Sequence, residues 1–368
     1  MAPPAEKSNH VEARLTRWPG LIEHYRRFLP VDEQTPVVTL NEGNTPLIEA
    51  PTIAERLGRE IKLYFKYEGA NPTGSFKDRG MTVAVSKALG QGARVAICAS
   101  TGNTAASAAA YAGRAGMRSF VLIPKGAVAL GKLSQSVMHG ARVLEIIGNF
   151  DICLKVVRDL ARHDPVGIRL VNSINPDRIA GQKTAAFEIC DQLGEAPTHQ
   201  FLPVGNAGNI TAYWAGYQEY RTAGFATRLP KMMGYQAAEA APIVLGRAID
   251  DPHTVATAIK IGNPASWTGA TAARDESGGL IDMVTDAEIL SAYRLIAAQG
   301  IFAEPASAAS VAGALKFGAS GGIKPGSVVV CTLTGHGLKD PDTALKNLSN
   351  TIVVEPDLDK VLKILERE

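Results

Sequence analysis

One lysine stands in a setting that suits covalent chemistry. Lys77 follows a Pro/Gly turn in the segment NPTGSFKDRG at 71–80, just before a helix predicted over 78–89. A lysine that is desolvated there can lose its proton and attack a carbonyl carbon as a free amine. Ser75 would cap the helix, and Asp78 would suit its first turn. The same residues also fit an ordinary helix start with Lys77 exposed, so this loop alone does not decide between the two.

A second polar loop separates an apolar strand predicted over 94–98 from an alanine-rich helix. Four of its five positions carry hydroxyl or amide groups: Ser100, Thr101, Asn103 and Thr104. Free backbone N–H groups at a helix N-terminus, flanked by hydroxyls, suit a carboxylate or a phosphate. A helix cap needs only one such residue. Four of them favour a bound anion over a capped helix alone.

A third loop combines glycine with asparagine between a strand predicted over 199–204 and a helix over 210–221. It consists of Gly205, Asn206, Ala207, Gly208 and Asn209. Glycines let the backbone curl, so that several N–H groups converge on one phosphate. The loop lacks the Gly-Lys-Ser/Thr of a Walker A motif and the spacing of a dinucleotide motif. We therefore expect a phosphate monoester here, with a plain turn as the alternative.

Two further segments carry candidate ligand groups. Asn172, Ser173 and Arg178 form a second candidate anion site, because a guanidinium can fork onto a carboxylate or phosphate. A surface Arg178 behind a helix cap at Asp177 explains the same residues equally well. Thr334 places a neutral hydroxyl at the end of a very apolar strand over 327–333.

Two ionisable residues near these loops receive no catalytic role. His336 is the only histidine in a loop of this kind, and its imidazole could act as a general base. It has no Asp or nucleophile beside it in sequence, so a structural role is the expectation. Glu304 opens a late helix, and a capped helix start explains it.

Alternating apolar runs and helix-length amphipathic segments predict βα units around a largely parallel sheet. The predicted strands cover 63–66, 94–98, 119–123, 142–147, 199–204 and 327–333. The predicted helices cover 78–89, 104–112, 132–139, 151–162, 178–193, 210–221, 286–299 and 307–317. Ligands of such sheets bind at the carboxyl ends of the strands, where all the polar loops above lie.

The chain is long enough for two α/β lobes, with 368 residues of which 46% are hydrophobic. We expect a smaller lobe at 94–170, and a larger lobe from 1–93 and 171–368 that includes an N-terminal extension at 1–35. The net charge of +2 gives no support for nucleic-acid binding.

The remaining composition indicates a cytoplasmic protein. Four cysteines without CxxC spacing are expected to be reduced, and seven histidines without ligand spacing predict no metal site. The first ten residues lack the apolar region of a secretory signal, and no run is apolar enough to span a membrane.

A lysine nucleophile, a cradle for one phosphate and a polar strand-end loop together suggest pyridoxal phosphate held as a Schiff base. With these residues the chain resembles the threonine synthases, which belong to the tryptophan-synthase-β-like (type II) pyridoxal phosphate enzymes. The resemblance covers nearly the whole chain, from NEGNTPL at 41–47 to about Asp342. Its strongest motif is PTGSFKDRG at 72–80. Its KDRG ending, joined to GNAGN at 205–209, favours threonine synthases over dehydratases, whose phosphate loop is usually a run of glycines.

The resemblance implies a two-lobed open-sheet α/β fold, a homodimer, and pyridoxal 5'-phosphate in the cleft between the lobes. Lys77 would hold the cofactor, Asn103 would bond its ring hydroxyl oxygen, and Thr334 would meet the pyridine nitrogen. Backbone N–H groups of Gly205 to Asn209 would hold its phosphate. A hydroxyl does not keep a proton on the ring nitrogen as an aspartate would, so the electron sink is weaker and suits elimination and replacement chemistry.

The substrate implied is O-phospho-L-homoserine, which would be converted with water to L-threonine and phosphate in a β,γ-replacement, the last step of threonine biosynthesis. Such an enzyme is a carbon–oxygen lyase acting on a phosphate ester, and the freed Lys77 amine would move protons at Cα and Cβ. Ser100, Thr101 and Thr104 would bind the carboxylate. The γ-phosphate would be bound by Asn172, Ser173 and Arg178, with Asn206 beside them.

Three other activities remain open from the sequence: a serine/threonine dehydratase, a cysteine-synthase-like β-replacement enzyme, and a non-catalytic binder of phosphorylated metabolites.

Overall fold

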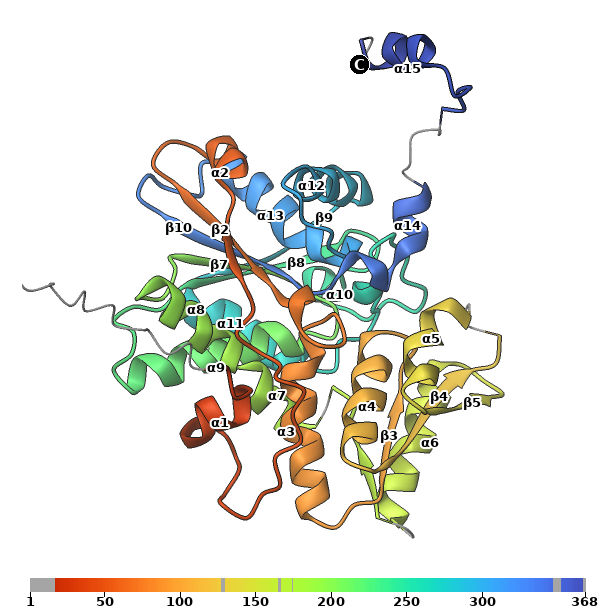
Figure 1. The fold of residues 1–368 in the computed structure, drawn as a ribbon. Helices are drawn as coiled ribbons and strands as arrows, with labels where there is room; N and C mark the ends of the chain where they lie inside the picture. The colour runs from red at the N-terminus through yellow and green to blue at the C-terminus, as the bar shows by residue number, and fades with distance from the viewer. Residues whose placement is uncertain (1–16, 127–129, 165–166, 174, 347–351, 367–368) are drawn as a thin grey trace, which may run out of the picture.

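Two sheets, each covered by helices, make up the protein in the computed structural model (Figure 1). The structure describes residues 17–126, 130–164, 167–173, 175–346 and 352–366. The first sixteen residues of the predicted N-terminal extension, including those weighed as a signal segment, lie outside the described residues. The α/β class expected from the sequence is confirmed.

The larger sheet has six strands in the order β1-β2-β10-β7-β8-β9. They are β1 (Leu47–Glu49), β2 (Lys62–Tyr67), β7 (His199–Pro203), β8 (Lys231–Ala237), β9 (Leu280–Val284) and β10 (Val328–Leu333). Only β1 is antiparallel to its neighbour. Leu333, the last residue of β10, pairs with Tyr67, the last residue of β2. Thr334 therefore leaves the sheet at the edge where the loop toward Lys77 begins.

Helices cover both faces of this sheet. The apolar residues of α2 (Pro51–Leu57), α12 (Asp286–Ala298) and α13 (Ala308–Ala319) bury one face, around Phe65 and Phe201. The opposite face packs against α1 (Leu21–Tyr25), α8 (Thr184–Leu193), α9 (Gly208–Thr222) and α11 (Trp267–Ser277). Figure 1 shows these two groups on opposite sides of the strands. Burial on both faces makes the sheet a rigid base for the loops at its carboxyl edge.

The smaller sheet has four parallel strands in the order β5-β4-β3-β6. They are β3 (Val95–Ala99), β4 (Arg118–Pro124), β5 (Arg142–Ile146) and β6 (Ile168–Leu170). One face packs against α3 (Lys77–Gly90) and α4 (Asn103–Arg114), and the other against α6 (Phe150–His163). α5 (Leu130–Met138) lies beside α4. The strands of this sheet all fall inside the segment 94–170.

Two glycines let α3 and α7 (Pro176–Gln182) touch backbone to backbone. A β-carbon at Gly181 would lie 2.0 Å from the carbonyl oxygen of Arg79, and one at Gly80 would lie 2.7 Å from that of Arg178. No larger residue fits this crossing without moving a helix. The contact fixes the start of α3, where Lys77 stands, against the first turn of α7.

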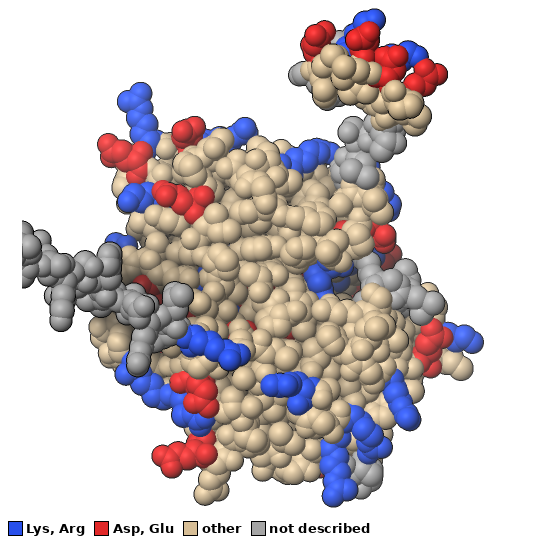
Figure 2. Space-filling model, in the orientation of Figure 1, with Lys and Arg blue, Asp and Glu red and all other residues tan. Residues whose placement is uncertain are grey.

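The remaining elements are short helices: α10 (Pro242–Leu245), α14 (Pro341–Lys346) and α15 (Leu358–Leu365), with 3-10 turns η1 (Arg26–Phe28), η2 (Glu68–Ala70), η3 (Thr257–Ile259), η4 (Pro305–Ser307) and η5 (Gly337–Lys339). None of the helices in the described part of the chain has the length and apolar character that crossing a membrane requires. Acidic and basic side chains are interspersed on the face in Figure 2, with uncharged surface between them.

Three expectations about local structure were wrong. The helix predicted over 178–193 is two helices, because Thr184 bonds the Gly181 carbonyl where that glycine packs on α3. Ser75 does not cap α3; its buried hydroxyl has no protein partner. The cap of α7 is Asn175, whose side chain accepts from the backbone N–H of Asp177.

Candidate active site

Backbone pairing places the lysine loop against the loop that follows β10. The N–H of Phe76 donates to the Thr334 carbonyl (3.1 Å), and the N–H of His336 donates to the Gly74 carbonyl (2.9 Å). Lys77 is the first residue of α3, and therefore lies next to Thr334 although the two are far apart in sequence. The structure brings these two predicted site residues together.

The amine of Lys77 is enclosed by the protein although its side chain is not fully buried. Part of its side chain remains accessible, yet the atoms packed around its amine lower the pKa to about 7, mainly through burial. The charge of Arg178 lowers this pKa further, and Glu304 opposes the shift. The alternative of a fully solvated surface lysine is thereby excluded. Near neutral pH a large share of the amine is uncharged, as a nucleophile must be.

Glu304 stands between two residues predicted to meet the cofactor. Its Oε2 accepts from Asn103 Nδ2 (2.9 Å), and its Oε1 accepts from Thr334 Oγ1 (2.8 Å). Ser307 Oγ lies 3.1 Å from the same Thr334 oxygen. Burial raises the pKa of Glu304, while the hydrogen bonds from Asn103 and Thr334 lower it. No role was expected for Glu304; its one visible signal in the sequence was an acid directly before the helix start at Pro305.

A second buried acid ties the lysine loop to α4. Asp78 accepts from the N–H (2.7 Å) and the hydroxyl (2.6 Å) of Thr73, and from Ser107 Oγ (2.6 Å) on α4. Burial raises the pKa of Asp78 to about 6, against the hydrogen bonds from Ser107 and Thr73. Through these bonds α4, which begins at Asn103, is held beside Lys77. The helix-dipole role expected for Asp78 is thus only part of its function.

Four charges buried under the lysine loop form a network that anchors α3. Arg79 donates to Glu68 on η2 and to Glu188 on α8, each at 2.7 Å. Lys66 donates to Glu188 at 2.8 Å. All four side chains are at most 3% exposed. The network fixes Arg79, which stands two positions after Lys77. Of its four residues, only Arg79 belongs to a motif that the sequence revealed.

The loop at 205–209 continues from β7 into α9, the helix beginning at Gly208. A β-carbon at Gly205 would lie 3.0 Å from Ile259 Cα, and Ala207 has a φ of 64°, unusual for a residue with a β-carbon. The first-turn N–H groups of α9 have no intrahelical acceptors. The amide of Asn209 is buried with neither of its polar atoms paired. The loop therefore offers an anion both the free N–H groups of the first turn of α9 and the unpaired Asn209 amide.

Arg178 is fully buried, which excludes the surface alternative. One nitrogen, Nη1, donates to the Val171 carbonyl (3.2 Å), but Nε and Nη2 have no partner. Burial lowers the pKa of Arg178 to about 10. Leaving a buried guanidinium without an anion is costly, so these two nitrogens mark a place for an anionic ligand.

The other predicted substrate residues differ in their exposure and in how many of their polar atoms are already hydrogen-bonded. Asn172 is buried and binds the backbone of Ala99 at both its amide oxygen (3.1 Å) and its amide nitrogen (2.9 Å). It therefore fastens the end of β3 and keeps one amide N–H for another partner. Ser100 accepts from the N–H of Gly102 (3.3 Å). Ser173 and Thr101 are partly exposed, while Thr104 is buried.

His336 is engaged locally. Its Nδ1 accepts from the N–H of Leu338 (3.1 Å), and its ring packs near Tyr67 and Phe302. Across the described residues, no three His, Cys, Asp or Glu side chains come together as metal ligands would. All four cysteines are free and buried.

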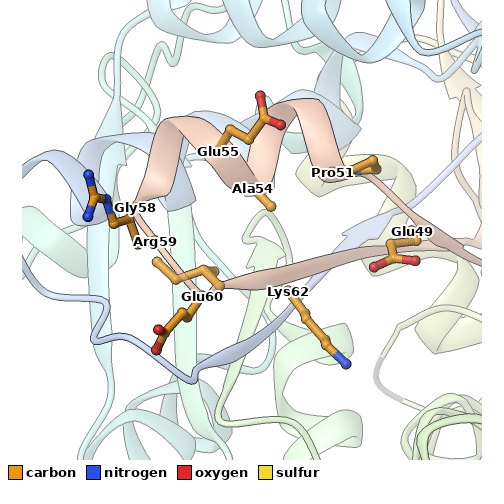
Figure 3. Close-up of a pocket in the computed structure, with 9 residues that line it drawn as sticks. Glu49, Pro51, Ala54, Glu55, Gly58, Arg59, Glu60 and Lys62 are labelled. Atoms are coloured by element: carbon orange, nitrogen blue, oxygen red, sulfur yellow. The ribbon is translucent and has the colours of Figure 1, made fainter.

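A surface pocket between α2 and β2 lies elsewhere (Figure 3). It has a volume of about 400 Å³, and exposed acids and bases such as Glu55, Arg59 and Glu60 line it. None of its lining residues has a buried polar side chain without a partner. Buried polar atoms without a partner are found instead in residues of the predicted site, among them Arg178 and Asn209.

Known proteins resemble this chain along most of its length. Residues 38–335 match the family described as pyridoxal-phosphate dependent enzyme. The "Threonine synthase" of Synechocystis sp. is 60% identical over 352 residues, covering 95% of this chain and 91% of that protein. The "Threonine synthase" of Mycobacterium leprae is 58% identical, covering 95% and 96%.

Solved structures share the fold at low identity. Maize serine racemase matches with a TM-score of 0.70 and 21% identity, over 88% of this chain and 93% of that chain. The processed form of threonine deaminase isoform 2 from Solanum lycopersicum matches with a TM-score of 0.68 and 21% identity, over 94% and 89%.

The residues around Lys77 fit the cofactor of this family. Pyridoxal phosphate needs an uncharged lysine amine for its aldehyde and N–H donors for its phosphate. The structure offers the Lys77 amine with its lowered pKa, and the 205–209 loop with the unpaired Asn209 amide. Together with the relatives above, these features establish that the chain belongs to the pyridoxal-phosphate dependent enzymes and, among them, to the threonine synthase family.

Proposed function

We propose that the protein converts O-phospho-L-homoserine and water to L-threonine and phosphate. The observation that carries the choice of substrate is Arg178. It is buried with two unpaired nitrogens, close enough to Lys77 for its charge to lower the lysine pKa. An amino acid that is attached near Lys77 and carries a phosphate would give this guanidinium its anion.

The proposed cofactor residues are those predicted from the sequence. Lys77 binds the cofactor covalently, Asn103 bonds its ring oxygen, and Thr334 meets its ring nitrogen. The N–H groups of residues 205–209 hold its phosphate, with the Asn209 amide as an additional donor. Support comes from the buried, unpaired polar atoms in this loop and from the position of Asn103 and Thr334 on the two oxygens of Glu304.

The proposed substrate residues lie on the side of α4 and α7. Ser100, Thr101 and Thr104 bind the substrate carboxylate at the start of α4, where free N–H groups gather. The phosphate is bound by Arg178 with Ser173, the remaining Asn172 amide N–H, and Asn206. Asn206 also binds the segment just before α11, since its carbonyl accepts from the N–H of Ser266 (3.1 Å).

The bound cofactor supplies an electron sink that makes the protons on the substrate's Cα and Cβ acidic. Lys77 takes up and returns these protons, because a large share of its amine is uncharged near pH 7 and the substrate replaces it at the cofactor. Arg178 holds the phosphate group before and after it leaves the substrate. Residues 94–170, which carry Asn103 and the start of α4, form a domain that closes over the substrate and excludes water.

The test is product analysis with the purified, cofactor-loaded protein. O-phospho-L-homoserine should yield equal amounts of phosphate and L-threonine, and Lys77→Ala should abolish both products and the visible absorption band of the lysine-bound cofactor. No phosphate release, or 2-oxobutanoate from L-threonine as the main product, would contradict the proposal and favour a dehydratase.

We further infer a cytoplasmic homodimer. The four free, buried cysteines suit a reducing compartment. Sedimentation of the pure protein measures the oligomeric state directly, and a monomer at micromolar concentration would contradict the dimer.

A further inference from the structure

One backbone carbonyl of the lysine loop is bound by side chains from two other segments. The carbonyl oxygen of Thr73 accepts from Gln135 Nε2 of α5 (3.2 Å) and from Lys339 Nζ of η5 (3.1 Å). The two side chains also bind each other, because Lys339 Nζ donates to Gln135 Oε1 (2.5 Å). The three groups form a closed triangle of hydrogen bonds, the Gln135–Lys339 bridge.

The Lys339 side chain reaches this position through space that a glycine leaves free. A β-carbon at Gly74 would lie 3.3 Å from Lys339 Cδ, and the φ of Gly74 is 83°, which favours glycine. Burial lowers the pKa of Lys339, while the carboxyl groups of Glu304 and Asp78 favour its charged form. An ammonium group that donates to neutral oxygens makes charge-assisted hydrogen bonds, which are stronger than neutral ones.

Thr73 connects the bridge to the lysine. Its N–H and its hydroxyl donate to Asp78, the residue after Lys77, at 2.7 and 2.6 Å. The carbonyl of the next residue, Gly74, accepts from the N–H of His336 (2.9 Å). The segment that the bridge holds is therefore itself fastened to α3 and to the loop after β10.

The other end of the bridge belongs to the domain that is proposed to close over the substrate. α5 lies beside α4, the helix that begins at Asn103, and both lie at the upper end of the smaller sheet in Figure 1, toward the larger sheet. A second contact between the two sides joins Asn103 to Glu304 (2.9 Å), but Asn103 is proposed to turn to the cofactor. No bridge residue is proposed to bind the cofactor or the substrate, so the bridge stays available throughout the reaction.

We propose that Gln135 and Lys339 are positioning residues that hold residues 94–170 closed over Lys77 while the substrate reacts. The inference rests on the proposed function and on the closure described there. With the bridge formed, α4 and α5 stay against the lysine loop, and bulk water stays out of the cleft. With the bridge broken, the closed arrangement becomes rarer, so the substrate is bound less tightly and is released more often before the reaction is complete.

Release at the wrong moment has its own product. Once the bond between Cγ and the phosphate oxygen has broken, the amino acid that remains is unsaturated, and outside the cleft its enamine becomes an imine that water hydrolyses to 2-oxobutanoate and ammonia. One O-phospho-L-homoserine and one water then give phosphate, 2-oxobutanoate and ammonia, the same atoms that otherwise form phosphate and L-threonine. The share of 2-oxobutanoate among the products therefore measures early opening.

The test compares Gln135→Leu, Lys339→Met and the double variant as cofactor-loaded enzymes. Gln135→Leu removes both hydrogen bonds to α5, whereas Lys339→Met removes the charged one and leaves the bond from Gln135 to Thr73. A hydrogen bond to a charged group shifts an equilibrium by about 10–100-fold. In Gln135→Leu the KM for O-phospho-L-homoserine and the share of 2-oxobutanoate should therefore each rise by about 10-fold or more. The double variant should match Gln135→Leu, because the bridge is already broken there. The visible band of the lysine-bound cofactor should stay unchanged in all three variants.

Gln91→Leu is the matched control, because it makes the same change at an exposed glutamine that contacts Arg169 at the end of α3. It should leave the KM and the product share unchanged, and a Gln135→Leu variant that behaves like it would refute the inference. A double variant clearly worse than Gln135→Leu would show that Lys339 acts apart from Gln135, which also refutes the bridge. Hydrogen exchange in α4 and α5 of the loaded enzyme, expected to be faster in Gln135→Leu, reads the bridge without the reaction. If the unsubstituted enzyme releases no phosphate, the proposed function fails, and this exchange alone decides on the bridge. Gln135→Ala takes the place of Gln135→Leu if that variant does not fold.

Discussion

Replacing Glu188 by Gln should destabilise the protein strongly while changing few atoms. Glu188 accepts from both terminal nitrogens of Arg79 (each 2.7 Å) and from Lys66 (2.8 Å), and it is only 3% exposed. With Glu68, the network holds two buried cations and two buried anions. The amide has nearly the shape of the carboxyl group, so the change is one of charge rather than of packing.

The magnitude follows from the charge balance. Without the Glu188 carboxylate, Arg79 and Lys66 share the single anion Glu68, and one buried positive charge is left uncompensated. Removing one partner of a buried ion pair costs about 3–5 kcal/mol. A typical substitution costs about 1 kcal/mol. Glu188→Gln should therefore lower the free energy of unfolding by about 3–5 kcal/mol.

The loss should depend on pH in a defined direction. Burial alone would raise the pKa of Glu188, but the charges of Arg79 and Lys66 overcome it and hold the pKa well below its ordinary value of 4.5. A depressed pKa adds stability above pH 4.5, and this stability disappears as the pH falls below that value. The difference between Glu188→Gln and the unsubstituted protein should therefore be largest at neutral pH and shrink in acid.

The assay is urea unfolding of the cofactor-free protein, followed by circular dichroism, so that cofactor binding does not add to the measured stability. Glu55→Gln on the exposed side of α2 is the matched control and should stay within about 0.5 kcal/mol. A Glu188→Gln variant within 1 kcal/mol of the unsubstituted protein at pH 7, with an unchanged denaturant slope, would refute the reasoning.

Three further predictions follow from the site. Because the pKa of Lys77 is lowered to about 7, the rate of cofactor capture by the apoenzyme should rise with pH and reach half its maximum near 7. A half-point near 10.5 in stopped-flow absorbance would contradict a buried amine. Arg178→Met should lower kcat/KM for O-phospho-L-homoserine by about 10–100-fold, since a hydrogen bond to a charged group contributes about 1.5–3 kcal/mol; unchanged kinetics would exclude Arg178 from phosphate binding, and unchanged cofactor absorbance would serve as the control. Gly181→Ala should cost about 1–3 kcal/mol or more, because its β-carbon would lie 2.0 Å from the Arg79 carbonyl oxygen; an unchanged thermal midpoint would show that the α3–α7 contact can yield.

The sequence predicted best what depends on neighbours along the chain. The loops at 71–80 and 205–209 stand out because proline, glycine and polar groups cluster within a few residues after a strand. Glu304 could not be found in this way, since its partners Asn103 and Thr334 are 201 and 30 positions away and meet it only after both sheets have formed. Burial was equally hidden: nothing local distinguished a surface Arg178 from one that is fully enclosed.

Short elements and glycine contacts explain the errors in the predicted fold. The three-residue strands β1 and β6 are too short for a periodic signal, and the Gly234 within β8 weakens the strand pattern there. The break between α7 and α8 arises from the packing of Gly181 against α3, a contact between segments about 100 positions apart. Such contacts leave no local periodicity to detect.

The crossing of α3 and α7 at Gly80 and Gly181 also sets the spacing between Lys77 and Arg178. Lys77 stands one turn before the crossing on one helix, and Arg178 stands in the first turn of the other. Because bare backbones meet there, no side chain between the helices can change the distance between the backbones of Lys77 and Arg178. With Arg178 as the proposed phosphate ligand, selection among phosphorylated amino acids becomes a matter of length. An analogue shorter by one methylene carries the same charges over a shorter length and should therefore be bound less well.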